Sequence, residues 1–170
     1  MILGMSEASF TLFHVVLSLI GIAAGLAMAY GALGSRLYGG WTALFLASTI
    51  LTSVTGYFFP RDHILPSHIV GAISLVLLAL CVAALYRFRL AGAWRWIFVA
   101  SGFAALYLNV FVGVVQSFLK IPWLAVLAPT QKEPPFVIAQ LAVLAAFVIA
   151  GIFAVRRFHP QPAVAALRAA

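Results

Sequence analysis

FTLFHVVLSLIGIAAGLAMAYGAL, residues 10–33, is the most informative stretch for the fold, because it is a long apolar segment without a charged side chain. About 20 apolar residues are enough for an α-helix to cross the hydrocarbon core of a bilayer. Four further segments are also long and apolar, with Arg95 near the start of one as their only charged side chain, so the predicted spans are residues 10–33, 41–59, 65–86, 94–119 and 136–155. Glycines and prolines lie between them, as expected where helices end. The sequence predicts an all-α bundle of five transmembrane helices.

The composition agrees with a polytopic membrane protein. The 170 residues are 65% hydrophobic and 8% charged, whereas soluble domains are about 45–50% apolar and about 25% charged. Five spans occupy most of the chain, so residues 1–170 are predicted to form a single transmembrane domain. The net charge of +7 comes from scattered side chains at the ends of apolar segments. The expected partner is therefore the lipid bilayer, and nucleic acid is not expected.

Basic residues are divided unequally between the two sides of the predicted bundle. The poorer side receives only Arg61, Lys120 and Lys132. The richer side receives Arg36, Arg87, Arg89, Arg95, Arg156, Arg157 and Arg168. Because cytoplasmic loops carry an excess of Lys and Arg, the richer side is expected to be cytoplasmic. This orientation places the N-terminus outside and the C-terminus inside.

Polar side chains at membrane depth gather toward the predicted outer side. His14 and His68 lie near the outer ends of the first and third spans. Asn109 and Gln116 lie in the outer half of the fourth span, and Gln140 lies near the outer start of the fifth. Ionisable groups are costly within a bilayer, so their presence favours a functional site. We expect these five residues to surround one outer polar pocket.

Small residues follow one face of several predicted helices. Gly21 and Gly25 form a GxxxG pair in the first span, and Ala105, Asn109 and Gly113 follow the same spacing in the fourth. Such faces let helices pack closely, within one chain or against a partner in a homo-oligomer or membrane complex. The second span carries a hydroxyl-rich stripe, predicted to pack against other helices: Thr42, Thr49, Ser53 and Gly56.

Three kinds of chemistry fit the polar residues, and a fourth interpretation needs none. His14 and His68 have the residue type that holds a b-type haem between two helices. Histidines beside amides also suit proton or quinone chemistry. His63 and Asp62 are candidate metal ligands in the outer loop, because imidazole and carboxylate bind transition metals. In the fourth interpretation, the histidines only hydrogen-bond to hydroxyls and lock the helices together.

The leading hypothesis from these residues is a small redox-associated membrane component with one outer pocket for haem b or quinone. One alternative is a non-enzymatic interaction or assembly subunit, and another is a carrier of a small molecule or metal. No nucleotide loop, CxxC, HExxH or GxSxG motif is present, so the sequence identifies no catalytic residue.

The outer segment KIPWLAVLAPTQKEPP, residues 120–135, is too short to span but apolar enough to lie in the membrane interface. Thr130 and Glu133 have the spacing of a capping box, and Pro134 and Pro135 suit the first turn of a helix. We therefore predict a helix start after an interfacial loop. A functional alternative is a lid over the outer pocket.

Two stretches carry a resemblance to known proteins: residues 107–140, which include APTQKEPPF, and LTSVTGYFFP at residues 51–60. They resemble small bacterial inner-membrane proteins of no established function, which implies a multi-pass protein of the inner membrane. The positions of His14 and His68 are also similar to those in haem-binding bundles of the cytochrome b561 type. That similarity implies these two residues as haem ligands, although the further paired histidines of the family are missing.

Overall fold

The computed structural model describes residues 1–60 and 66–160, which are helical apart from loops and an isolated bridge between Ile2 and Met5. Five helices are long and apolar enough to cross a membrane, and they coincide with the five predicted apolar segments. They are α1 (Glu7–Leu33), α2 (Gly39–Thr55) with the 3-10 turn η1 (Gly56–Phe58), α3 (Pro66–Val82) with the π-helical turn η2 (Ala83–Arg87), α4 (Trp94–Lys120) and α6 (Pro134–Arg157). A short helix, α5 (Pro122–Leu127), precedes α6.

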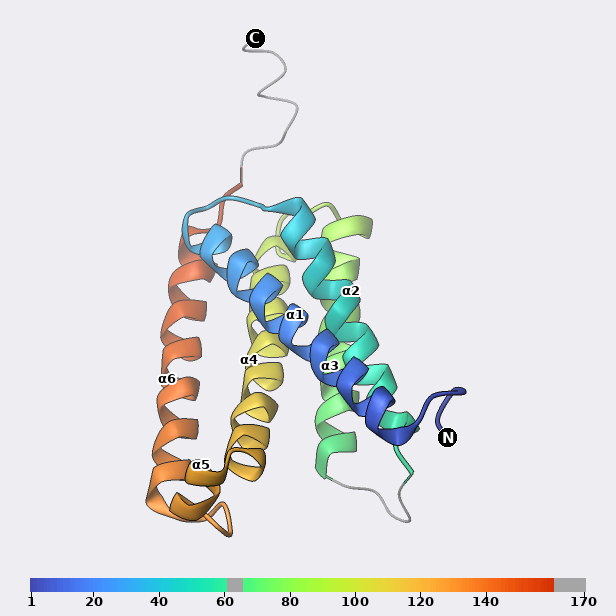
Figure 1. Cartoon of the computed structure of the whole chain (residues 1–170). Helices are drawn as coiled ribbons and strands as arrows, with labels where there is room; N and C mark the ends of the chain where they lie inside the picture. Colours follow the sequence, from blue (N-terminus) through green and yellow to red (C-terminus); the bar gives the residue numbers. More distant parts are fainter. Residues whose placement is uncertain (61–65, 161–170) are drawn as a thin grey trace.

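Successive long helices run antiparallel, and α1 and α2 lie across a layer formed by α3, α4 and α6 (Figure 1). The helix α4 is central, because it contacts α1, α3, α5 and α6. We call the end where α1, α3 and α6 begin the N-terminal end of the bundle, and the opposite end the C-terminal end. The axis of α1 is oblique, so its first turns lie near α2 and α3 while its last turns approach α6 (Figure 1).

Glycines on α1 allow the close approach of three helices. A Cβ atom on Gly21 would lie 2.8 Å from Thr49 Oγ1 of α2 and 3.0 Å from Asn109 Nδ2 of α4. A Cβ atom on Gly25 would collide with the buried side chains of Leu106 and Phe45. The predicted packing face of α1 is therefore real, and it is used inside the chain. Gly21 and Gly25 are buried, so this face is not free for the partner suggested by the sequence pattern.

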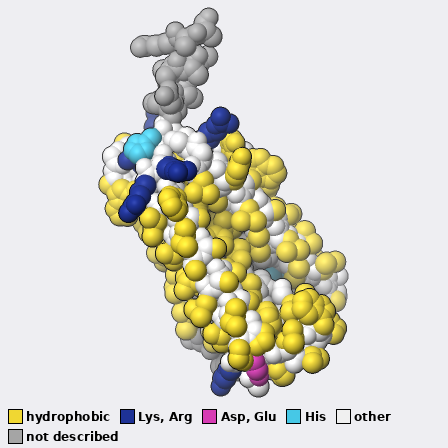
Figure 2. Space-filling view, turned by 90° about the vertical axis from the view of Figure 1, so that its left-hand side faces the viewer, with side chains coloured by type: hydrophobic (Ala, Val, Ile, Leu, Met, Phe, Trp, Pro, Cys, Tyr) yellow, Lys and Arg dark blue, Asp and Glu magenta, His cyan; other side chains and the backbone are white. Residues whose placement is uncertain are grey.

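The outer surface of the bundle has the character of a multi-pass membrane protein. Apolar side chains cover its sides, and Lys and Arg side chains lie at its ends (Figure 2). Helix α6 is the most peripheral of the long helices, with Ala154 as its only buried residue. Its remaining apolar residues face outward or lie half-buried against α4 and α1. Such an exposed apolar helix is stable in hydrocarbon and not in water.

Candidate functional site: a polar cavity among four helices

A cavity of about 110 Å³ lies among α1, α2, α3 and α4, toward the N-terminal end of the bundle. It brings together three of the residues that the sequence analysis proposed: His14, His68 and Asn109. The other lining residues are Ser18, Thr49, Thr52, Ser53, Gly56, Tyr57, Ser67, Val70, Gly71, Ser74, Leu108 and Val112. The cavity is therefore lined by many hydroxyl, amide and imidazole groups, although it lies within an apolar bundle.

The imidazole of His14 is held by α2 through one ring nitrogen. Its Nδ1 lies 2.8 Å from Thr55 Oγ1. Assigning the Thr55 hydroxyl proton to the carbonyl of Leu51, 2.7 Å away, makes His14 Nδ1 the donor of the shared hydrogen bond. The ring of Phe59 packs edge-on against His14, with 5.3 Å between ring centroids. These contacts fix the ring and leave Nε2 as a hydrogen-bond acceptor.

The imidazole of His68 is positioned by an aromatic neighbour in η1. Its ring stacks on Tyr57 with centroids 5.4 Å apart. The Tyr57 hydroxyl donates to the backbone carbonyl of His68 at 2.7 Å, which joins the end of α2 to the start of α3. His68 lies in the first turn of α3, whereas His14 lies about two turns inside α1. The two residues reach the same cavity from different positions along their helices.

Asn109 joins α4 to α1 at the inner side of the cavity. Its Oδ1 accepts a hydrogen bond from the Ser18 hydroxyl at 2.9 Å, and its Nδ2 donates to the Ser18 carbonyl at 3.5 Å. Asn109 is 7% exposed, which confirms that it faces protein and not lipid. One Nδ2 proton is not used by these two bonds, because an amide group carries two donors.

Thr49 is the cavity residue whose role the sequence did not reveal. The stripe that contains it predicted helix packing, and the residue is indeed buried, with 2% of its surface exposed. Its hydroxyl nevertheless makes no hydrogen bond within the described part of the chain. A buried polar group without a partner costs about 1–3 kcal/mol. Thr49 is one of the residues that line the cavity, so its enclosed hydroxyl is a candidate donor to a molecule bound there.

Other candidate residues lie elsewhere. Gln116 is exposed and does not line the cavity. Gln140 donates to the carbonyl of Phe111 at 3.2 Å and so joins α6 to α4 outside the cavity. Asp62 and His63 lie outside the described residues, 1–60 and 66–160. Within those ranges, no group of three His, Cys, Asp or Glu side chains is placed to hold a metal ion.

The loop before α6 leads into a helix start where the sequence predicted one, but its hydrogen bonds differ from the expected capping box. Pro134 and Pro135 begin the helix as predicted, but Glu133 is the N-cap residue, so Thr130 and Glu133 do not form a capping box. Instead the Glu133 carboxylate accepts hydrogen bonds from the Thr130 hydroxyl, at 2.7 Å, and from the backbone of Thr130 and Lys132. Helix α5 lies beside α4 and α6 (Figure 1) and contributes no residue to the cavity, so it is not a lid.

The cavity is too small for the haem suggested by the histidine pattern. Sites for ligands of that size have volumes of about 300–1,000 Å³, whereas this cavity has about 110 Å³. A cavity of about 150 Å³ holds one benzene ring in another protein. The free space between His14 and His68 is therefore much smaller than a haem site, and it is also smaller than that benzene cavity.

Comparison of the chain with protein-family models, with curated proteins and with solved structures found no match.

Proposed function

We propose that this protein is a redox-associated membrane component that binds the head group of a quinone in the polar cavity. The observation that carries the proposal is the buried, unpartnered hydroxyl of Thr49 in a cavity that also presents His14 and Asn109. A quinone head group is one six-membered ring with two carbonyl oxygens, and it enters a membrane protein from the hydrocarbon region. Its hydrogen-bonding needs agree with the polar lining of this cavity, which must widen to admit the ring.

Each polar residue has a distinct role in this proposal. The Thr49 hydroxyl donates to one quinone carbonyl, and the unused Nδ2 proton of Asn109 offers a second donor nearby. His14 Nε2 accepts a hydrogen bond from a hydroxyl of the reduced form, the quinol, because Nδ1 already donates to Thr55. The aromatic rings of Tyr57 and His68 form one wall. The proposal concerns binding, and electron transfer is left to a partner in the membrane.

The cellular setting is part of the same proposal. The arginine-rich C-terminal end of the bundle lies at the cytoplasm, which places the cavity in the outer half of the membrane with the N-terminus outside. The resemblance to small bacterial inner-membrane proteins supports the inner membrane as the location. Quinones are dissolved in that membrane, so the ligand reaches the cavity without crossing water.

The test is quinone binding by the full chain purified in mild detergent, measured by equilibrium partition of a short-chain ubiquinone analogue. Thr49→Val keeps the side-chain shape and removes the donor, and we expect binding to weaken about threefold to tenfold. His14→Phe keeps a ring against Phe59 and removes the acceptor, so it should weaken quinol binding more than quinone binding. Thr42→Val is the matched control, because Thr42 is a buried hydroxyl of the same helix that bonds to the Tyr38 carbonyl outside the cavity.

Two results would contradict the proposal. The first is equal binding by the wild-type, Thr49→Val and Thr42→Val proteins, which would mean that the analogue partitions into detergent or lipid. The second is a Soret absorption band in the purified protein that disappears in His14→Phe, which would show that haem enters the bundle after all.

A further inference from the structure

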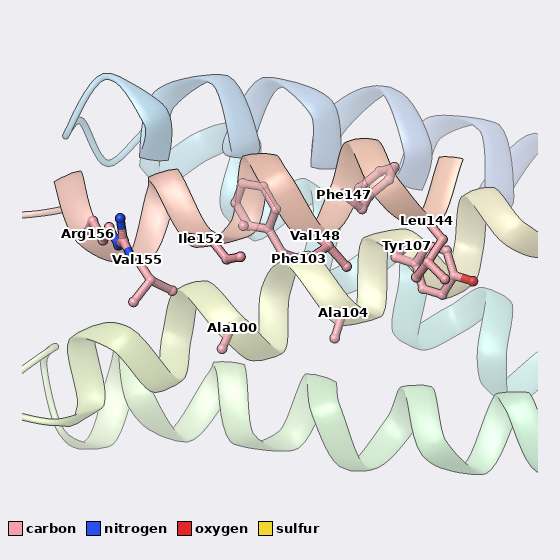
Figure 3. Close-up of a pocket in the computed structure, with 11 residues that line it drawn as sticks. Ala100, Phe103, Ala104, Tyr107, Leu144, Phe147, Val148, Ile152, Val155 and Arg156 are labelled. Atoms are coloured by element: carbon pink, nitrogen blue, oxygen red, sulfur yellow. The ribbon is translucent and has the colours of Figure 1, made fainter. Parts of the chain in front are cut away.

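A second hollow lies on the other side of α4, where α4 and α6 diverge to leave an apolar groove of about 490 Å³ (Figure 3). Small side chains leave room for it, namely Ala100 and Ala104 on α4 and Gly151 on α6. Phe103 and Phe147 line it from the two helices. The groove does not share a residue with the polar cavity, so its occupant is independent of quinone binding.

From these features we infer that the groove holds an acyl chain of an anionic phospholipid, with the lipid phosphate at Arg156. The groove is open to the surroundings, because Val148 and Ile152 on its α6 side are each 49% exposed. In a bilayer such a surface is filled by hydrocarbon. The length of the groove and the charge at its mouth indicate which molecule supplies that hydrocarbon.

The length of the groove favours an acyl chain over a partner helix. On α6 the lining runs from Leu144 to Arg156, and a separation of twelve positions corresponds to about 18 Å at 1.5 Å per residue. One leaflet of the hydrocarbon core is about 15 Å thick, whereas a partner helix would need a contact surface along much of the full core of about 30 Å. Tyr107 lies at the end of the groove opposite to Arg156 (Figure 3). The groove therefore matches the tail of a lipid from a single leaflet.

The charge at the mouth of the groove favours an anionic head group. Arg156 lines the groove, and the end of the bundle to which it belongs is rich in arginine. The chain has three acidic residues: Glu7 and Glu133 lie at the opposite end of the bundle, and Asp62 is outside the described residues. Among residues 1–60 and 66–160, no carboxylate is therefore available to Arg156. The phosphate of an anionic lipid supplies the missing negative charge, and arginine binds phosphate well.

The test is the selectivity of lipid retention. The full chain is inserted into nanodiscs of equal amounts of phosphatidylglycerol and phosphatidylcholine with identical tails, then extracted gently and examined by native mass spectrometry. We expect phosphatidylglycerol to be retained preferentially, and Arg156→Gln to reduce that preference about fivefold. Arg157→Gln is the matched control, because it makes the same charge change on a neighbouring residue that does not line the groove.

A second pair of variants tests the groove itself. Ala100→Leu fills the hollow and should reduce the retention of both lipids, whereas Ala145→Leu adds the same volume to an exposed position of α6 outside the groove and should not. Equal retention of the two lipids by the wild-type protein would overturn the inference. An equal loss for Arg156→Gln and Arg157→Gln would also overturn it, as would a mass of two chains without bound lipid, which would identify the occupant as a second copy.

Discussion

The polar cavity and the apolar groove lie on different faces of the same helix, α4, and they are opposite in construction. At the cavity, Asn109 of α4 is hydrogen-bonded to Ser18 of α1. Close packing of the helices around Gly21 leaves little free space there. At the groove, α4 presents Ala100 and Ala104 to a shallow space that is open to the surroundings. In these two proposals, the bundle binds a quinone head group where its helices pack most tightly. It binds a lipid tail where they pack most loosely.

The largest expected difference in stability is between two glycine-to-alanine substitutions, one on the cavity side of α4 and one at the groove. Gly25→Ala forces a Cβ atom against Leu106 and Phe45, which are fully buried and have no space to move. We expect a loss of about 1–3 kcal/mol in unfolding free energy. Gly151→Ala at the groove places its Cβ atom 3.6 Å from Phe103 Cδ1, an ordinary contact, so stability should change by less than about 0.5 kcal/mol.

Thermal denaturation of both variants in the same detergent would measure this difference. Equal destabilisation by the two substitutions would mean that the α4–α6 contact is as tight as the contact of α1 with α2 and α4, and the contrast between cavity and groove would be lost.

The next effect concerns the hydrogen bonds of α4. Asn109→Ala removes the bonds to Ser18, and each bond between membrane helices contributes about 0.6 kcal/mol, with a maximum of about 1.7. We therefore expect a loss of about 1 kcal/mol. Tyr107→Phe, two residues away and lining the groove, keeps the ring packed on Phe147 and should leave stability unchanged. Unfolding in denaturant, followed by circular dichroism, would compare the stability of the two variants. Equal losses of stability would contradict the view that α4 is hydrogen-bonded on its cavity face and not on its groove face.

A smaller change in stability is expected when either of two buried threonines of α2 is replaced by valine, and the two replacements should differ in sign. Thr42→Val removes a hydroxyl that donates to the Tyr38 carbonyl at 2.9 Å, so it should lower stability by about 0.5–1 kcal/mol. Thr49→Val removes a hydroxyl that makes no hydrogen bond within residues 1–60 and 66–160, so it should leave stability unchanged or raise it. Parallel melting curves without quinone would measure this, and a clear loss of stability in Thr49→Val would show that the hydroxyl is already hydrogen-bonded.

The smallest effect is a pH-dependent change in local stability, expected at the turn that joins α5 to α6. Hydrogen bonds from Thr130, and from the backbone of Thr130 and Lys132, lower the pKa of the Glu133 carboxyl. Because the folded pKa lies below the unfolded value, the turn is stabilised above the unfolded pKa, and that contribution is lost as pH falls through the folded pKa.

Amide hydrogen exchange of Thr130 and Lys132 should therefore accelerate, relative to other exposed amides, when the pH is lowered below the usual range of a glutamate. Thr130→Val weakens this response, and Glu133→Gln abolishes it. A response of the same size in Glu133→Gln would assign the acid sensitivity to another group.

The sequence predicted the five spans because their signal is local: each is long, apolar and bounded by glycine or proline. It also predicted that His14, His68 and Asn109 would come together, since antiparallel neighbours and a helical period of 3.6 place them at one end of the bundle. It failed for Gln116, which lies two turns beyond Asn109 on the same face of α4. The oblique axis of α1 leaves that part of α4 uncovered, and Gln116 is exposed (Figure 1).

Two other features depend on tertiary packing and leave no mark in the sequence. Thr49 belongs to a stripe of hydroxyls, and only the assembled helices show that this hydroxyl has no hydrogen-bond partner. The groove is lined by apolar residues that look like any lipid-facing surface, so its existence depends on how α4 and α6 diverge. The haem hypothesis depends on a quantity of the same kind, because ligand types are visible in a sequence but the free volume between them is not.

The central position of α4 also has a consequence for how the protein is made. A ribosome delivers the helices in order from the N-terminus, so α1, α2 and α3 are made before the central helix that packs against α1 and α3. Until α4 arrives, Ser18 lacks its Asn109 partner and the Gly25 face of α1 lacks Leu106. These polar and close-packing groups therefore lack their partners until the fourth helix has been made. The packing of α1 and α3 is complete only when α4 is present. The groove forms last, when α6 packs against α4.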